Sequence, residues 1–221
     1  MKEIARNIES RVFSSGAATT GTSAAARAMK SMQNFLTASS TAFAGTAGGL
    51  ASPTAKRTVY QMVTASDTAD ELSVSVFNTV LEQVYYNGGN PEAVYVSPAV
   101  KRQISNFTAT NQNRNIAAIE KKIVAALDFY YSDFGVIQVV MDRWVPQATN
   151  TVTTTAAADT SGQMFFIERA KCRLAWLRPV QHTLVGKRGD SVAGMVLGEV
   201  TLEMLNPSAC IRISGVNNVT A

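Results

Sequence analysis

The fold is decided near the end of the chain, where residues 174–205 read LAWLRPVQHTLVGKRGDSVAGMVLGEVTLEML. Two apolar arms flank a polar turn at residues 186–191, whose two glycines can take the positive φ that a hairpin reversal requires. After the turn, polar and apolar side chains alternate from Glu199 to Met204, which is the period of a strand with one wet and one dry face. The stretch therefore predicts a long hairpin. An arm of about a dozen residues would reach about 40 Å, beyond the usual strand length.

The composition indicates a folded chain that has to bury a large core. Of 221 residues, 46% are hydrophobic and 16% are charged. A chain of this length buries about 70% of its unfolded surface, as one large domain or two small ones. It has no run of about 18 apolar residues, and its first residues lack the apolar core of a signal peptide. We therefore expect a soluble protein made in the cytoplasm, with no membrane partner.

The net charge of +4 is placed unevenly along the chain. Residues 1–60 contain seven basic and two acidic residues, and the remaining chain contains 13 basic and 14 acidic ones. A positive bias at one end can face a polyanion, but there is no dense basic run and no interleaved aromatic platform. The pattern argues against sequence-specific recognition of nucleic acid.

The first 55 residues predict one helix followed by a long excursion. Ile4, Ile8 and Val12 have helical spacing in residues 2–13, but no capping residue precedes them, which favours the remainder of a longer helix. Residues 14–55 are rich in Ala, Ser, Thr and Gly. A few larger side chains would pin such a segment, and it would be a linker or lid in an enzyme, or would order against neighbours in an assembly. Those side chains are Arg27, Met29, Met32, Phe35, Leu36 and Phe43.

The middle of the chain predicts helices and strands in close succession. A capping box at residues 68–71 would open a helix through residues 72–85, which the glycines after Asn87 would close. A strand at residues 93–96 precedes Ser97-Pro98, a typical helix start. The almost wholly apolar residues 136–141 predict a strand at the buried centre of a sheet. Residues 164–167 are expected to lead into the hairpin, and one more short strand is expected at residues 210–213.

The sequence contains no residue set that predicts catalysis, a metal site or a cofactor. His182 is the only histidine, and a partly exposed strand residue explains it better than a catalytic role does. Cys172 and Cys210 have no CxxC partner, and we expect buried free thiols rather than a disulfide. The turn at residues 186–189 lacks the spacing of a phosphate loop, and Asp133 with Gly135 predicts a turn rather than a calcium loop. A small hydrolase with a serine nucleophile stays a remote alternative, since such an enzyme would need a base.

Several pieces, in their order along the chain, resemble the major capsid proteins of tailed bacteriophages with the Hong Kong 97 fold, and among them the SU-ten-like major head proteins. These pieces are the helix at residues 2–11, Asn87-Gly-Gly-Asn-Pro, Val96-Ser-Pro with residues 101–107, Tyr130-Tyr-Ser-Asp-Phe-Gly, and Val185-Gly-Lys-Arg-Gly-Asp-Ser before Gly198-Glu-Val-Thr-Leu-Glu.

The resemblance implies an α+β fold with a peripheral (P) domain and an axial (A) domain. Residues 1–71, with the spine helix and the excursion, and the long hairpin at 174–206 would form the P domain. Residues 72–173 would form the A domain, and residues 207–221 would supply its return strand and a C-terminal tail. Family members carry an N-terminal arm and an extended loop before the spine helix. Neither is found here, so we expect that this part was removed, left out or never present.

The function implied by the resemblance is a major capsid protein that self-assembles into the icosahedral head shell around double-stranded DNA. Its partners would be copies of itself in hexamers and pentamers, with decoration, scaffold or portal proteins as further candidates, and its location would be the virion. An encapsulin-like compartment shell protein is the alternative. Subunit contacts are expected at charged residues of the helix and the hairpin, namely Glu9, Arg11, Lys187, Arg188, Asp190, Glu199 and Glu203.

Overall fold

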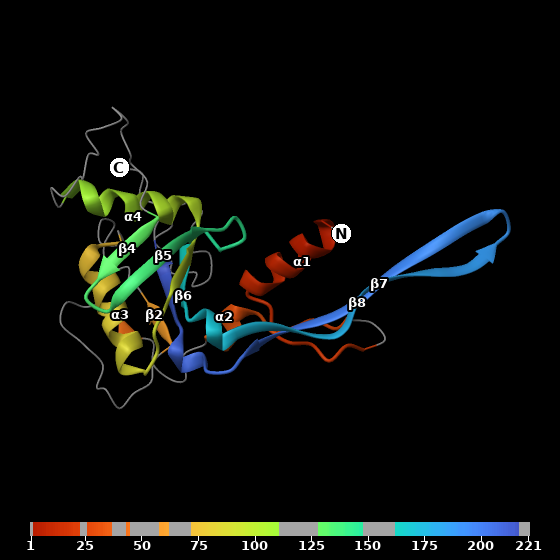
Figure 1. Ribbon diagram of the computed structural model, residues 1–221, viewed down its shortest axis with the longest axis horizontal. Coiled ribbons are helices and arrows are strands. Elements are labelled where there is room, and N and C mark those ends of the chain that lie inside the picture. The colour runs from red at the N-terminus through yellow and green to blue at the C-terminus, as the bar shows by residue number, and fades with distance from the viewer. Residues whose placement is uncertain are drawn as a thin grey trace, which may run out of the picture.

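Among the residues that the computed structural model describes, a seven-stranded sheet and a separate two-stranded hairpin make up the β structure of this α+β protein. The structure describes residues 2–22, 26–36, 43–44, 58–61, 72–110, 128–147 and 162–216. In Figure 1 the large sheet and two of its helices form a body at one end of the molecule, and the hairpin projects far from it. The predicted α+β class is confirmed.

The large sheet has the strand order β1-β2-β9-β6-β3-β5-β4. Its central strand β6 (Gly162–Ile167) runs antiparallel to both neighbours and is buried at every residue. The remaining strands are β1 (Phe43–Ala44), β2 (Val59–Gln61), β3 (Ala93–Val96), β4 (Phe129–Ser132), β5 (Gly135–Met141) and β9 (Ile211–Val216). The strands predicted at residues 93–96 and 210–213 are thus present as β3 and β9, and the chain returns to the sheet after the hairpin. Residues 164–167, expected to lead into the hairpin, instead belong to β6 at the centre of the large sheet.

One face of this sheet is covered by α3 (Val74–Tyr86) and α4 (Pro98–Thr110). Because strand residues alternate between faces, Met164 and Phe166 of β6 point into this core. Phe77 of α3 is fully buried there, with its ring centroid 5.1 Å from that of Phe166 and 4.7 Å from that of Tyr130. The packed aromatic rings hold the helix layer to the sheet.

Helix α3 begins two residues later than the sequence predicts. Ser73 is its N-cap, because the Ser73 hydroxyl accepts a hydrogen bond from the Val76 N–H. The expected capping box at 68–71 lies outside the described residues, and Leu72 precedes the helix but is buried in the core. The predicted glycine stop is confirmed, since Gly88 has φ 80° and the N–H groups of Gly88 and Gly89 donate to the last turn.

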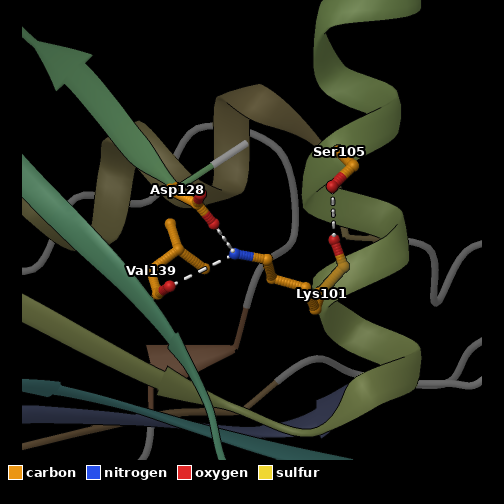
Figure 2. A network of polar contacts seen from close by, with 4 residues as sticks. All are labelled: Lys101, Ser105, Asp128 and Val139. Carbon is orange, nitrogen blue, oxygen red and sulfur yellow. Dashed lines mark hydrogen bonds and ion pairs between the residues drawn. The ribbon is translucent and has the colours of Figure 1, made fainter. Parts of the chain in front are cut away.

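Helix α4 starts at Pro98 as predicted, and Lys101 fixes it to the sheet (Figure 2). The Lys101 ammonium donates to Asp128 Oδ1 at 2.9 Å and to the Val139 carbonyl at 3.2 Å. Its side chain is only 15% exposed, whereas that of Asp128 is 73% exposed. A single cation therefore joins the first turns of α4 to β5 and to the start of β4.

The position predicted for residues 136–141 is wrong in one respect. Strand β5 lies next to the edge strand β4, not at the centre of the sheet. Its Ile137 and Val139 are buried under the helices, but Val136, on the other face, is half exposed. The apolar residues of β5 therefore lie on two faces, one covered by the helices and one that the described part of the chain does not cover.

The second core joins the opposite face of the sheet to the hairpin. Phe165 and Ile167 of β6 point into it, and Leu202 and Met204 close it from the hairpin base. Helices α1 (Lys2–Phe13) and α2 (Met32–Phe35) complete it. Helix α1 has the predicted bounds, whereas α2 lies in the segment that was expected to be an excursion without a helix. The predicted anchors Met32 and Leu36 are buried there, and Met29 and Phe35 pack against them. Much of the remaining excursion lies outside the described residues.

The hairpin consists of β7 (Cys172–Arg188) and β8 (Ser191–Met204), which pair antiparallel. Gly189, with φ 67°, makes the reversal with Asp190. Two short 3-10 helices, η1 (Arg169–Lys171) and η2 (Pro207–Ala209), link the hairpin to β6 and β9. The predicted hairpin is confirmed, and its arms are longer than the dozen residues expected.

Candidate assembly surface

The hairpin has two chemically different faces near its base. Leu174 and Trp176 lie opposite Leu202 and Val200 on the face that looks toward α1. Arg173 and Arg178 lie opposite Glu203 and Glu199 on the other face. The register shifts between Trp176 and Gln181, so that extra β7 residues bulge from the ladder. One of them, Leu177, is 77% exposed.

A groove of about 770 Å³ separates α1 from the apolar face of the hairpin. Ile4 and Ile8 line it from α1, and Trp176 and Val180 line it from β7. Of the α1 residues Phe13 alone is buried, and it packs against the rings of Tyr95 and Phe165. The apolar stripe of α1 is therefore held at its C-terminal end and remains partly open along the rest of its length.

The charged face is closed by ion pairs within the hairpin. Arg173 donates two hydrogen bonds to the Glu203 carboxylate, at 2.8 and 3.2 Å. These bonds lower the pKa of Glu203 below its ordinary value. Arg178 lies 3.4 Å from Glu199. All four side chains are partly exposed, so each pair adds little to the free energy of unfolding and mainly fixes the cross-strand register.

The distal half of the hairpin exposes apolar side chains on both faces. Pairs across the strands place Leu184 and Val196 on one face and Val185 and Met195 on the other. All four are exposed, Leu184 by 69%. In the described part of the chain no third strand pairs with either arm. Both edges and both faces are thus available to a partner.

The edge of the large sheet offers a second exposed apolar patch. Phe129 and Tyr131 of β4 are exposed, and Tyr131 pairs with Val136 of β5. These side chains lie on the face that α3 and α4 do not cover, because Ile137 and Val139 fill the covered face. This edge of the body is therefore an exposed apolar surface.

The seven predicted contact residues do not gather at one place. Glu9 is exposed at the rim of the groove, and Asp190 is exposed at the hairpin tip. Arg11 binds its own chain, because its guanidinium donates to the carbonyls of Met29 and Ala17. Glu199 and Glu203 pair with arginines of the same hairpin. The side chains of Lys187 and Arg188 are outside the described part, although their backbone forms the end of β7.

Sequence reasoning missed the apolar groove and the contact between the two thiols. The spacing of Ile4, Ile8 and Val12 showed an apolar stripe on α1, but not that it would face the hairpin. Cys172 Sγ and Cys210 Sγ lie 4.0 Å apart, although the residues are 38 positions apart in the sequence. Both cysteines are free, and Cys210 is fully buried, but Cys172 is only partly buried, so the expectation of two buried thiols is wrong for Cys172. No signal in the sequence could have indicated this contact.

The geometry gives no support to an enzyme site. His182 is exposed on β7, and its ring lies over Gly194, where an added Cβ would collide with Nε2. Among the described residues it has no hydrogen-bonded acid or nucleophile, and no group of three or more His, Cys, Asp or Glu side chains could hold a metal ion there. In the same residues no helix is long and apolar enough to cross a membrane.

Comparison with known proteins identifies the class of protein. The family model described as SU10 major capsid protein matches residues 1–217. The chain belongs to this family of structural capsid proteins, and the predicted resemblance is confirmed. The family match favours a phage head protein over the encapsulin alternative and over a serine hydrolase.

Three solved structures are similar to parts of the chain. The holo-SrpI encapsulin complex from Synechococcus elongatus PCC 7942 has a TM-score of 0.48 and 8% identity over 74% of this chain. The capsid of the cyanophage P-SCSP1u has a TM-score of 0.40 and 16% identity over 73%. The virus-like particle from Pyrococcus furiosus has a TM-score of 0.33 and 15% identity over 71%.

In each case this chain spans about half, 54%, of the matched structure's chain. No curated protein matches it.

Proposed function

We propose that this protein is the major subunit of an icosahedral bacteriophage head, in which copies of itself form hexamers and pentamers around double-stranded DNA. The family match over residues 1–217 is the observation that carries the proposal. The proposed fold is of the Hong Kong 97 type, with α1 as the spine helix, the hairpin in the peripheral domain and the seven-stranded sheet in the axial domain. The virion is its proposed location, after synthesis in the host cytoplasm.

The exposed hairpin supports self-association on physical grounds. A two-stranded hairpin is marginally stable in water, and this one carries β7 and β8 arms of 17 and 14 residues. Leu177, Leu184 and Val196 are all more than half exposed along it. Contiguous exposed apolar surface of this kind marks a protein interface, because covering it removes apolar area from water. A neighbouring copy in a shell is the partner that the family implies.

The charged tip is proposed to set the register between copies. Lys187, Arg188 and Asp190 lie at the end of the hairpin that is farthest from the large sheet (Figure 1). Glu199 and Glu203 already have arginine partners, so they are less available to a neighbouring tip than their charges alone indicate. Glu9, exposed on α1, is the better candidate for a carboxylate that a basic tip from another copy would meet.

Charge reversal at the tip tests the proposal. The double substitution Lys187→Glu with Arg188→Glu changes no residue of either core, so the melting temperature of the unassembled subunit should stay nearly the same. Assembly at moderate salt should fail or give aberrant particles, because each weak contact recurs in every copy of a closed shell. Thermal unfolding of the unassembled subunit measures the melting temperature, and sedimentation velocity and negative-stain microscopy of the full-length chain measure assembly.

The matched control is the exchange Lys187→Arg with Arg188→Lys, which keeps both charges and should assemble normally. Normal shells from the charge-reversed variant would contradict the role of the tip. Failure of the unsubstituted chain to form any closed particle, alone or with its partner proteins, would contradict the proposed function itself.

A further inference from the structure

We infer that Cys172 and Cys210 form a redox-sensitive covalent lock, a site of oxidation that joins the base of the hairpin to the large sheet. Their sulfur atoms lie 4.0 Å apart, which is contact distance for two thiols. A disulfide needs a separation of about 2.0 Å between the sulfurs. Small rotations of the two side chains can supply the difference.

The two cysteines occupy matching positions where the chain enters and leaves the hairpin. Cys172 is the first residue of β7, and its cross-strand partner Met204 is the last residue of β8. Cys210 follows η2 and directly precedes β9. Cys172 thus belongs to the first pair of the hairpin, and Cys210 precedes Ile211, which pairs with Phe166 of β6 in the large sheet. A bond here would close the covalent ring around the whole hairpin.

The backbone on both sides of the pair is fixed, so the thiols are held near each other. The Leu205 N–H donates to the Lys171 carbonyl at 2.9 Å, next to Cys172. The Cys210 N–H donates to the Pro207 carbonyl at 3.2 Å and ends η2. Both cysteines also belong to the second core, where Cys210 is fully buried. Two thiols held this way have a high effective concentration toward each other.

The two thiols differ in access, which sets the order of the steps. Cys172 is partly exposed and lines the groove between α1 and the hairpin, whereas Cys210 is buried. A small dissolved disulfide therefore reaches Cys172 first. The Cys172 thiolate attacks one sulfur of that disulfide, which forms a mixed disulfide and releases one small thiolate.

The second step closes the bond inside the protein. The Cys210 thiolate attacks Cys172 Sγ and expels the second small thiolate. Overall the protein loses two protons and two electrons, and the small disulfide is reduced to two thiols. The hydrogen bond with Cys210 and burial raise the pKa of Cys172, so the first step should be faster at higher pH, where more of this thiol is ionised.

The covalent lock would act after the particle leaves the host cell, and this role rests on the proposed function. A shell built in a reducing cytoplasm would keep the thiols free. After release into an oxidising medium, the same pair would close in each subunit. Each hairpin base would then be fixed to its sheet without any new contact between subunits.

Oxidation of the unassembled full-length subunit with oxidised glutathione tests the inference directly. We expect the intact mass to fall by two hydrogens, both titratable thiols to disappear, and reductant to restore them. Cross-linking of residues 38 positions apart constrains the unfolded chain, so the melting temperature should rise by roughly 5 to 15 °C. Peptide mapping should find the two cysteines in one linked pair.

The substitution Cys172→Ser provides the matched control, because this residue is partly exposed and tolerates a polar atom. The variant should fail to form the link and should melt at the same temperature with and without oxidant. Cys210→Ala removes the buried partner, and the exposed Cys172 should then keep one glutathione adduct. This second variant separates loss of the link from loss of folding.

Three results would overturn the inference: retention of both thiols in the folded subunit, two glutathione adducts per chain, or disulfide-linked dimers in place of the internal bond. An unchanged melting temperature after complete oxidation to the internal disulfide would overturn the predicted stabilisation. The measurement needs no shell, so it can succeed where the proposed function fails. Mass analysis of assembled particles before and after oxidant tests the role in a shell separately.

Discussion

The large sheet and the hairpin use apolar residues in opposite ways. In the sheet every residue of β6 is buried between two cores, and Phe77, Phe165 and Phe166 are inaccessible to water. Along the outer hairpin Leu184, Val196 and others of their kind are exposed. Apolar side chains thus stabilise the subunit by burial in the sheet, whereas on the outer hairpin they remain exposed to water. Burial within one chain accounts for the first region, whereas the exposed apolar surface of the second is of the kind that marks a protein interface.

This difference implies that folding and assembly can be disturbed separately. Changes to the sheet should lower the free energy of unfolding, whereas changes to the outer hairpin should leave it nearly unchanged and act on association. The base of the hairpin belongs to both regions, because Leu202 and Met204 are buried in the second core.

The largest expected effect comes from emptying the first core at Phe77. Phe77→Ala removes a fully buried ring that contacts Phe107, Tyr130 and Phe166. The lost burial and the remaining cavity should lower the free energy of unfolding by about 3–5 kcal/mol. Urea unfolding of the unassembled subunit, followed by circular dichroism, measures the loss.

Leu184→Ala sharpens the comparison, because it also shortens an apolar side chain but on the exposed outer hairpin. Its free energy of unfolding should stay within about 0.5 kcal/mol of the unsubstituted chain. Equal losses in the two variants would show that the hairpin is buried within the isolated subunit, contrary to the structure.

The elements with strong local signals were predictable from the sequence. The period of two after the Gly189 turn identified β8, and the helical spacing of Ile4, Ile8 and Val12 identified α1. Ser97-Pro98 marked a helix start and the glycines after Asn87 marked a helix end, because proline suits the first turn of a helix and glycine suits the residue just past its end. The predicted start of α3 is two residues early, because the sequence analysis relied on the capping box at residues 68–71 and did not consider Ser73, whose hydroxyl caps the helix.

Features that depend on distant residues were not predictable. The open face of β5 follows from the strand order, which the apolar run at 136–141 does not encode. The pairing of Glu199 with Arg178 depends on a bulge that shifts the register of β7. The contact between the two thiols arises only when both ends of the hairpin meet the sheet. Charge alone likewise does not show which side chains are free for a contact, since Arg11, Glu199 and Glu203 bind groups of their own chain.

A smaller effect is expected at the cation that joins α4 to the sheet. Lys101→Met keeps most of the aliphatic chain but removes the hydrogen bonds to Asp128 and to the Val139 carbonyl. Water can solvate the exposed Asp128, so the main cost is the partly buried carbonyl, about 1–2 kcal/mol in the free energy of unfolding. Thermal and urea unfolding of the subunit measure it.

The neighbouring Arg102→Met provides the control, because Arg102 is exposed on the same helix. It should change the free energy of unfolding by less than about 0.5 kcal/mol. If both variants lost the same stability, loss of positive charge on α4 would be the cause, and the contacts in Figure 2 would not explain the effect.

The smallest effect is expected on the charged face of the hairpin, and it should depend on pH. Arg173 donates to the Glu203 carboxylate and lowers its pKa. Because the folded-state pKa lies below the unfolded value of about 4.3, the stabilisation is complete above about pH 5. It falls as acid protonates Glu203 through its lowered folded-state pKa.

A double-substitution cycle with Arg173→Gln and Glu203→Gln isolates this pair from the other carboxylates. The coupling free energy from urea unfolding should be small and favourable at pH 7, weaker in high salt, and absent at a pH well below the lowered pKa. Both side chains are exposed, so solvent screens the pair and the effect on the subunit should be the least of the three. A coupling that persists in strong acid would show that packing between the two side chains, rather than charge, holds this register. The charged face would then stabilise the hairpin in the same way as the sheet stabilises the body, and the contrast between the two regions would be narrower than the structure indicates.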